Sequence, residues 1–177
     1  VAIIFGGKSA EHEVSLKSAK NVAGALDLTK YDCLILGISK EGTWYQFPST
    51  DVFQKIAFLS DRNLPAGADP VSLICHQGKA HIFSLESKKM AGLDIAFPVL
   101  HGTFGEDGCI QGLFKMVNLP FVGCGVLGSA IGMDKEVMKR LLKEANIPSA
   151  KYEVLYSYRP TKFEDLSKNL GLPFFIK

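Results

Sequence analysis

Two loops of the sequence combine acidic side chains with a histidine, and both are rich in glycine. Their acidic and histidine residues are Glu11, His12 and Glu13 in the first loop and His101, Glu106 and Asp107 in the second. Carboxylates in such loops could hold an ammonium group, and a histidine could hydrogen-bond a carboxylate. Taken alone, the first loop also fits a solvated helix start, and the second fits a loop histidine beside a helix-capping acid. The two loops are therefore more informative together than apart.

Each loop follows an apolar run that predicts a buried strand, Val1 to Phe5 for the first and Ile95 to Leu100 for the second. A helix is predicted to begin near Glu13, and its apolar face comprises Ala19, Val22, Ala23 and Leu26. Cys33 to Ile38 then predicts the next strand. This strand–helix–strand order predicts an α/β fold with a parallel sheet. Loops in such a sheet open at the carboxyl ends of the strands, so both could border one crevice.

The second loop leads into a further predicted helix. Glycines at 102, 105 and 108 would let backbone N–H groups approach a ligand closely. The helix is predicted from apolar residues spaced at i, i+3, i+4 and i+7, which are Ile110, Leu113, Phe114 and Val117.

The remaining segments predict a mixture of elements. They are a short strand at Trp44 and Tyr45, a helix over 52–59, a hairpin from 71–75 and 81–85, a helix capped by Asp134, a strand over 151–156, a helix over 163–170 and a strand over 173–177.

Composition excludes several classes of protein. The chain has 177 residues, of which 47% are apolar and 21% are charged, as in an ordinary globular protein. A net charge of +2 does not favour nucleic acid or a membrane surface as a partner. No apolar run approaches the length of a transmembrane helix, and no signal peptide is visible. The four cysteines lack metal-binding or redox spacing, so we expect free thiols, most of them buried, in a reducing cytoplasm.

One glycine motif offers an alternative function. Gly123 to Gly128 matches GxGxxG and precedes a predicted helix. Only 119–122 precedes it as a possible strand, and the acidic residue expected about 20 positions later would be Glu144, inside a helix. A glycine turn with close packing is the favoured interpretation. An NAD-binding oxidoreductase is the alternative.

Four stretches of the sequence resemble the D-alanine–D-alanine ligases, in the same order and with matching spacing. They are Phe5-Gly6-Gly7-Lys8-Ser9-Ala10-Glu11-His12-Glu13-Val14-Ser15, His101-Gly102 with Gly105-Glu106-Asp107-Gly108, Met133-Asp134-Lys135, and Pro173-Phe174-Phe175-Ile176-Lys177. The resemblance covers essentially the whole chain, and 39–94 is its least diagnostic part.

The resemblance implies an ATP-grasp ligase that acts in peptidoglycan synthesis. Such an enzyme phosphorylates one D-alanine with ATP and Mg²⁺ or Mn²⁺, and the amine of a second D-alanine attacks the acyl phosphate. By resemblance, Glu11 binds the ammonium of the first D-alanine, and Val14 and His101 line its pocket. Ser15 belongs to the same catalytic motif as Glu11. Two lysines, Lys135 and Lys177, would contact the ATP phosphates. A cytoplasmic homodimer is also implied.

The resemblance further implies a division into three parts. Residues 1–96 would form a Rossmann-like, parallel-sheet substrate domain, 97–148 a join that completes the sheet, and 149–177 the start of an α+β ATP-grasp domain. The metal ligands would lie beyond Lys177, and this chain would supply none. We therefore expect that more chain follows and that residues 1–177 alone lack ligase activity. A non-catalytic, ligase-like binding module is a further alternative.

Overall fold

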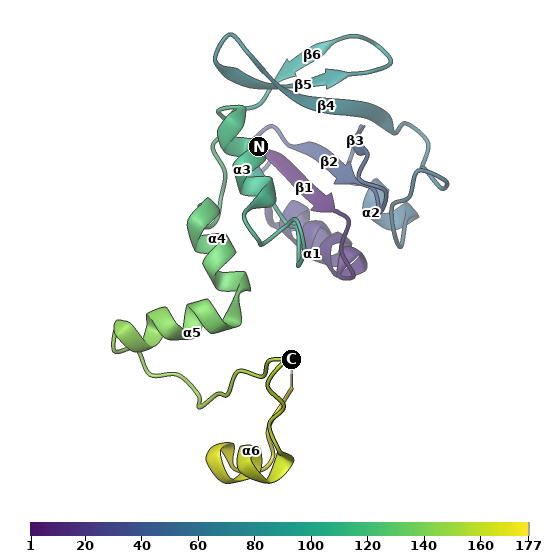
Figure 1. The fold of residues 1–177 in the computed structure, drawn as a ribbon. Coiled ribbons are helices and arrows are strands. Elements are labelled where there is room, and N and C mark those ends of the chain that lie inside the picture. Colours follow the sequence, from purple (N-terminus) through teal and green to yellow (C-terminus); the bar gives the residue numbers. More distant parts are fainter. Residues whose placement is uncertain (177) are drawn as a thin grey trace. The chain divides into compact units, whose positions relative to one another are not determined.

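The computed structural model describes residues 1–176 and contains two compact units, Val1–Met133 and Asp134–Lys177 (Figure 1). The division predicted from the sequence, with boundaries after residues 96 and 148, stays a prediction.

The first unit is built on a seven-stranded mixed sheet with the order β6-β5-β4-β3-β2-β1-β7. Its strands are β1 (Ala2–Gly6), β2 (Leu34–Ile38), β3 (Trp44–Phe47), β4 (Asp69–His76), β5 (Lys79–Ser84), β6 (Met90–Gly92) and β7 (Ala96–Pro98). β1 lies between β2 and β7 and is parallel to both, whereas all other neighbours are antiparallel. The predicted α/β class is confirmed, and the parallel part is limited to β2, β1 and β7.

Short connections account for three of the four antiparallel pairs, β2–β3, β4–β5 and β5–β6, whereas residues 48–68 separate β3 from β4. Only residues 39–43 separate β2 from β3, and a parallel pair would need a crossover of about a dozen residues or more. The chain therefore turns back, with the Ser39 N–H donating to the Thr43 carbonyl. The β4–β5 pair is the hairpin predicted from the sequence, and Gln77 and Gly78 form its tip.

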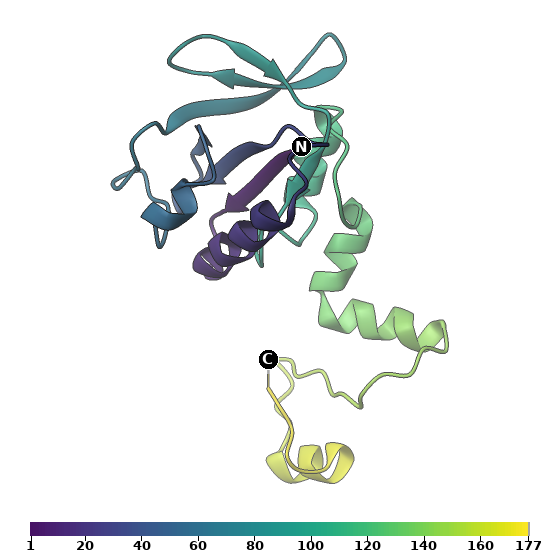
Figure 2. The ribbon, with the colours of Figure 1, turned by 180° about the vertical axis from the view of Figure 1, so that it is seen from behind.

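Helices cover both faces of the parallel strands (Figures 1 and 2). They are α1 (His12–Ala25) and α2 (Val52–Lys55) on one face and α3 (Cys109–Met116) on the other. The other helices of the chain are α4 (Val126–Met133), α5 (Lys135–Glu144) and α6 (Phe163–Leu170). Successive side chains of β1 point to opposite faces. Ile4 belongs to the apolar cluster that includes Phe114 of α3, and Ile3 to the one that includes Leu16 of α1. Burial on both faces accounts for the unbroken apolar run of β1.

Three expectations about secondary structure were wrong. The helix predicted over 52–59 is the single turn of α2. Residues 151–156 form no strand, only an isolated bridge between Tyr156 and Arg159, and 173–176 form none either. A strand is stable only beside a neighbour, and within the described residues neither segment pairs with one. Lys177 lies outside the described residues.

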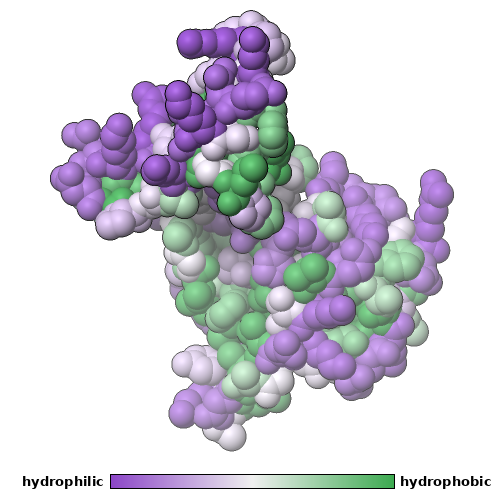
Figure 3. All heavy atoms as spheres, turned by 90° about the horizontal axis from the view of Figure 1, so that it is seen from below, coloured by the Kyte–Doolittle hydropathy of each residue, from purple (hydrophilic) through white to green (hydrophobic). Residues whose placement is uncertain are grey.

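The second unit contains α5 and α6. Asp134 caps α5 as predicted, since its Oδ1 accepts the Val137 N–H at 3.0 Å. Several large apolar side chains of this unit are exposed, including Tyr158, Phe175 and Ile176. Figure 3, a space-filling view of the whole chain from below, shows that apolar residues lie among hydrophilic ones on that face.

All four cysteines are unpaired, as predicted. Cys75, Cys109 and Cys124 are exposed, however, so the expectation that most cysteines are buried was wrong. They lie at the end of a hairpin strand, at a helix start and in a glycine turn, where little packs over a side chain. No described helix combines the length and apolar character needed to cross a membrane.

A carboxylate network holds the loop after β2 against the loop after α2. Glu41 accepts the Asp61 N–H at 3.0 Å and the Ser60 hydroxyl at 2.8 Å, and Asp61 in turn accepts the Thr43 hydroxyl at 2.7 Å. The backbone donor of Asp61 and the hydroxyl of Ser60 lower the pKa of Glu41 from its ordinary 4.5 to about 2. These bonds favour the ionised carboxylate, so the network stabilises the fold only while Glu41 is charged.

We predict that Glu41 makes the first unit sensitive to acid. Its pKa is lower in the folded chain than in the unfolded chain, so its stabilising contribution is complete above about pH 4.5 and declines as the pH falls toward 2. Glu41→Gln should lower the melting temperature at pH 7 and reduce the further loss between pH 4.5 and 2. Thermal melts across this range test it, with Glu86→Gln, at an exposed turn, as the control. An unchanged acid profile in Glu41→Gln would contradict the assignment.

Candidate functional site

The two loops singled out in the sequence meet at one edge of the sheet. β1 and β7 are parallel neighbours, so the chain leaves both at the same edge. The Glu11 carboxylate reaches the second loop, because a Cβ built on Gly102 would lie 2.7 Å from Glu11 Oε2. Glu11 and the His101–Gly102 segment, far apart in sequence, are therefore adjacent in the structure.

Ser15 connects the two sides of this edge. Its hydroxyl accepts the Gly6 N–H at 2.8 Å and donates to the Val99 carbonyl. The side chain is fully buried, so water cannot replace either bond. This hydroxyl joins the end of β1 to the segment after β7. Ser15 was expected to take part in catalysis, and this geometry suits a residue that positions the loops.

His12 is a structural residue of the first loop. It is fully buried, so the interpretation of 11–13 as a solvated helix start does not hold for this residue. The Leu59 N–H donates to its Nε2 at 2.9 Å, and its Nδ1 lies 2.8 Å from the Gly7 carbonyl. An acceptor at Nε2 and a donor at Nδ1 together require the neutral ring. The imidazole thereby holds the glycine turn after β1 against the segment at Leu59.

Glu13 agrees better than His12 with the interpretation of this segment as a solvated helix start. It lies in the first turn of α1 and pairs with Lys40 of the loop after β2. The hydrogen bond from Lys40 lowers the pKa of the Glu13 carboxyl below its usual value. Its charge is therefore already neutralised within the chain.

Glu11 differs from Glu13 in having no cationic partner among residues 1–176. It is exposed at the N-terminus of α1, and its backbone N–H donates to the Ser9 hydroxyl at 3.1 Å. The second loop contributes His101, whose Nε2 lies 3.1 Å from the Ser18 hydroxyl of α1. An unpaired carboxylate and an oriented imidazole at the same edge of the sheet can hold a small molecule that carries both an ammonium and a carboxylate.

The other acids of the second loop shape its backbone. Glu106 Oε2 accepts the Gly102 N–H at 2.7 Å, and Asp107 accepts the N–H groups of Phe104 and Cys109 at 2.8 and 3.0 Å. Partial burial raises the pKa of Asp107, but these backbone donors outweigh it and lower the pKa below its usual value. Asp107 thus binds the first N–H of α3, as a helix-capping acid would, although the N-cap position itself is Gly108.

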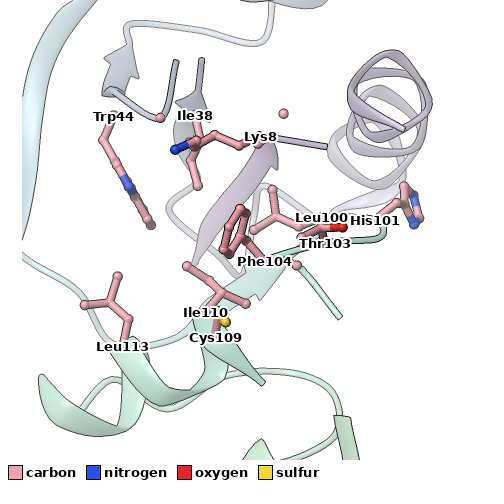
Figure 4. Close-up of a pocket in the computed structure, with 14 residues that line it drawn as sticks. Lys8, Ile38, Trp44, Leu100, His101, Thr103, Phe104, Cys109, Ile110 and Leu113 are labelled. Atoms are coloured by element: carbon pink, nitrogen blue, oxygen red, sulfur yellow. The ribbon is translucent and has the colours of Figure 1, made fainter. Parts of the chain in front are cut away.

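A hollow lies beside this edge, on the α3 side of the sheet. Figure 4 shows Trp44 and Phe104 on either side of it, with Ile110 and Leu113 below and Lys8 above. The Lys8 ammonium lies 5.7 Å from the centre of the Phe104 ring, a cation–π contact. The His101 ring points away from Phe104, toward α1. Val14, expected to line the substrate pocket, is half exposed on α1 and is not among the residues lining this hollow.

The predicted phosphate contacts lie elsewhere in the chain. Lys135 begins α5 in the second unit, directly after the capping Asp134. Lys177 lies outside the described residues, so its predicted role stays a prediction.

No group of three or more histidine, cysteine, aspartate or glutamate side chains within the described part of the chain could hold a metal ion.

The GxGxxG segment forms a glycine turn before α4. Residues 119–122 form no strand, and Phe121 makes only an isolated bridge to Ala96. A dinucleotide fingerprint needs a strand directly before its glycines, so this segment does not favour that alternative. The close packing expected here is absent at Gly123 and Gly125, because a Cβ on either would meet nothing within 4 Å.

Sequence reasoning missed three residues of this site, Ser9, Ser18 and Gly102 as a neighbour of Glu11. A signal for Ser18 was present, because Glu11, Ser15 and Ser18 are spaced at i, i+4 and i+7 along α1 and so share one helix face. No comparable signal existed for Ser9 or for the contact at Gly102, which depend on how the loops fold.

Comparisons with known proteins place the chain among sequence relatives of one family. The family model described as "D-ala D-ala ligase N-terminus" matches residues 1–124. All of this chain aligns with a D-alanine–D-alanine ligase from Oceanobacillus iheyensis at 45% identity, covering 49% of that protein. It aligns likewise with D-alanine–D-alanine ligase A of Escherichia coli K12 at 38% identity, covering 50% of that protein. The chain thus spans about half the length of the curated relatives it matches.

Solved structures show the same likeness. The D-alanine–D-alanine ligase from Coxiella burnetii matches 94% of this chain with a TM-score of 0.81 and 32% identity, and 47% of that protein is covered. The VanG D-Ala:D-Ser ligase from Enterococcus faecalis matches 85% of this chain with a TM-score of 0.72 and 35% identity, and 43% of it is covered.

We predict that Ser15→Ala destabilises the first unit. The change would leave the Gly6 N–H and the Val99 carbonyl buried without a partner, at a cost of about 1–3 kcal/mol. Urea unfolding measures the loss. Ser18→Ala is the control, because Ser18 lies on the same helix but is only partly buried. Equal stability of Ser15→Ala and the wild type would contradict the bridging role.

Proposed function

The chain belongs to the D-alanine–D-alanine ligase family, and on this premise we propose that the protein joins two D-alanines with ATP to form D-alanyl-D-alanine for peptidoglycan. We propose that the first unit of this chain holds the first D-alanine. The observation that supports this site is the unpaired Glu11 carboxylate, adjacent to the His101–Gly102 loop at the carboxyl ends of β1 and β7.

In this proposal Glu11 receives the ammonium of the first D-alanine. A charge-assisted hydrogen bond is stronger than a neutral one, and no lysine or arginine of the described chain competes for this carboxylate. His101, oriented by Ser18, and Val14, one turn along α1 from Glu11, would border the same amino acid. Ser15 would serve catalysis indirectly, by fixing the loop that carries Glu11.

The reaction proposed has two steps. A carboxylate oxygen of the first D-alanine attacks the γ-phosphorus of ATP, so that an acyl phosphate forms and ADP leaves. The amine of the second D-alanine then attacks the acyl carbon, and inorganic phosphate leaves as the amide forms. The residues of the first unit would contribute by holding the first substrate in place, which is a large part of catalysis in phosphoryl transfer.

Lys135 and Lys177 are proposed to contact the ATP phosphates. A lysine ammonium is a compact charge that suits a phosphate oxygen, and Lys135 stands at the first position of α5. Mg²⁺ or Mn²⁺ would assist by neutralising phosphate charge. The described residues offer no set of three side-chain ligands for such an ion, so we assign none of them to it.

The second substrate is proposed to be D-alanine. Relatives named D-alanine–D-alanine ligase align with the whole chain at 38–45% identity. A structural relative is a D-Ala:D-Ser ligase, so D-serine is the natural competitor to include in assays. Cytoplasmic location and homodimer formation, both implied by the family, complete the proposal.

The proposal is tested by phosphate release from ATP in the full-length protein. Release that depends on D-alanine, together with formation of the dipeptide, would support a ligase. The absence of ATP hydrolysis would favour the non-catalytic, ligase-like module instead, and hydrolysis indifferent to D-alanine would contradict D-alanine as the substrate.

We predict that Glu11→Gln weakens D-alanine binding far more than ATP binding. Loss of one charge-assisted hydrogen bond, worth roughly 1.5–3 kcal/mol, corresponds to about a ten- to hundredfold rise in the KM for the first D-alanine. Steady-state kinetics with each substrate varied measure both constants. Glu13→Gln is a matched control, since it removes a charge two residues away that Lys40 already neutralises. An unchanged D-alanine dependence in Glu11→Gln would reject the role.

We predict that Lys135→Ala lowers nucleotide affinity and leaves D-alanine recognition nearly unchanged. The reason is the loss of one cation that faces phosphate oxygens in the proposed complex. Calorimetry with a non-hydrolysable ATP analogue gives the affinity, and Lys143→Ala, two turns further along α5, is the control. Wild-type affinity in Lys135→Ala would remove this lysine from the nucleotide site.

A further inference from the structure

We infer that Gly102 is a positioning residue for the Glu11 carboxylate. The inference rests on the proposed function, because it assigns Gly102 a part in binding the first D-alanine. Because Gly102 has no side chain, it leaves the space that the Glu11 carboxylate occupies.

The evidence is steric. A Cβ built on Gly102 would lie 2.7 Å from Glu11 Oε2 and 2.8 Å from Ser9 Oγ, closer than real Cβ contacts allow. Both atoms end flexible side chains, and no backbone atom is among the near neighbours. A methyl group at this position would therefore displace Glu11 and Ser9 while the fold around it stays in place.

The backbone of Gly102 is held in its conformation by hydrogen bonds within its own loop. Its N–H donates to Glu106 Oε2 at 2.7 Å, and its carbonyl accepts the N–H groups of Gly105 and Glu106 at 3.1 and 2.9 Å. The residue is buried, and its φ of +67° is the left-handed conformation that glycine adopts readily. Three hydrogen bonds within residues 102–106 thus stabilise the loop conformation that places Gly102 against the Glu11 carboxylate.

Two other glycines of these segments, Gly6 and Gly108, are constrained by neighbouring backbone atoms instead. A Cβ on Gly6 would meet the Ile38 carbonyl at 2.2 Å, and one on Gly108 would meet the Val126 carbonyl at 2.9 Å. Those are backbone atoms of neighbouring elements, so substitutions there would disturb the fold. At Gly102, by contrast, an added Cβ would clash with the carboxylate that is proposed to bind the substrate.

The test compares Gly102→Ala with Gly78→Ala in the full-length protein. Gly78, at the β4–β5 hairpin tip, has a similar φ of +77°, and a Cβ there meets nothing within 4 Å. Both variants carry the same backbone strain, so their loss of thermal stability should be similar. Only Gly102→Ala should raise the KM for the first D-alanine, by about tenfold or more, with the KM for ATP within about twofold of wild type. An unchanged D-alanine KM in Gly102→Ala would overturn the inference.

A double-mutant cycle with Glu11→Gln shows whether the effect acts through Glu11. We expect Gly102→Ala to change D-alanine binding much less in the Glu11→Gln background than in the wild type. An equal effect in both backgrounds would overturn the inference, because Gly102 would then act on the substrate by another route.

A crystal structure of Gly102→Ala separates this inference from the proposed function. A displaced Glu11 carboxylate with an otherwise unchanged loop supports the positioning role whether or not D-alanine is the ligand. If the wild-type protein fails to bind D-alanine, the proposed function fails, and this structural readout still decides on Gly102. A carboxylate that stays in place in the variant would overturn the inference.

Discussion

The candidate site depends on one buried hydroxyl. Ser15 accepts a hydrogen bond from Gly6 at the end of β1 and donates one to Val99 just after β7, so one side chain of α1 joins a helix to both strands. Parallel pairing brings those strand ends to one edge, but it does not determine the path of the loops beyond them. The Ser15 hydroxyl fixes the start of that path, and because it is fully buried, water cannot replace it as a partner of Gly6 and Val99.

Around this bridge, several polar side chains of the two loops already have partners within the chain. His12 links the Gly7 carbonyl to the Leu59 N–H, Glu13 pairs with Lys40, and Asp107 binds two backbone donors. The Glu11 carboxylate has no ion-pair partner among the described residues, and it lies against a glycine whose backbone makes three hydrogen bonds. An unpaired carboxylate on a preorganised loop suits recognition of a small cationic group.

The sequence was most informative where local patterns determine structure. Apolar periodicity and the continuous run of β1 predicted the strands and helices of the parallel region, and the site loops followed from their place after those strands. The antiparallel pairs β2–β3, β4–β5 and β5–β6 follow from connections too short for a crossover, but the longer segment 48–68 between β3 and β4 does not determine their direction. Burial of His12 and Ser15 could not be predicted, because a polar side chain is buried only where tertiary structure supplies its partners. Residues 151–156 have strand-like alternation, but pattern alone does not provide a neighbouring strand.

The most direct test of the account is a crystal structure of the full-length protein with D-alanine bound. The account predicts that the ammonium of one D-alanine lies within hydrogen-bond distance of a Glu11 carboxylate oxygen, at the edge where β1 and β7 end, with His101 beside the amino acid. A first D-alanine bound with its ammonium away from Glu11, and with Glu11 still resting unpaired against Gly102, would contradict it.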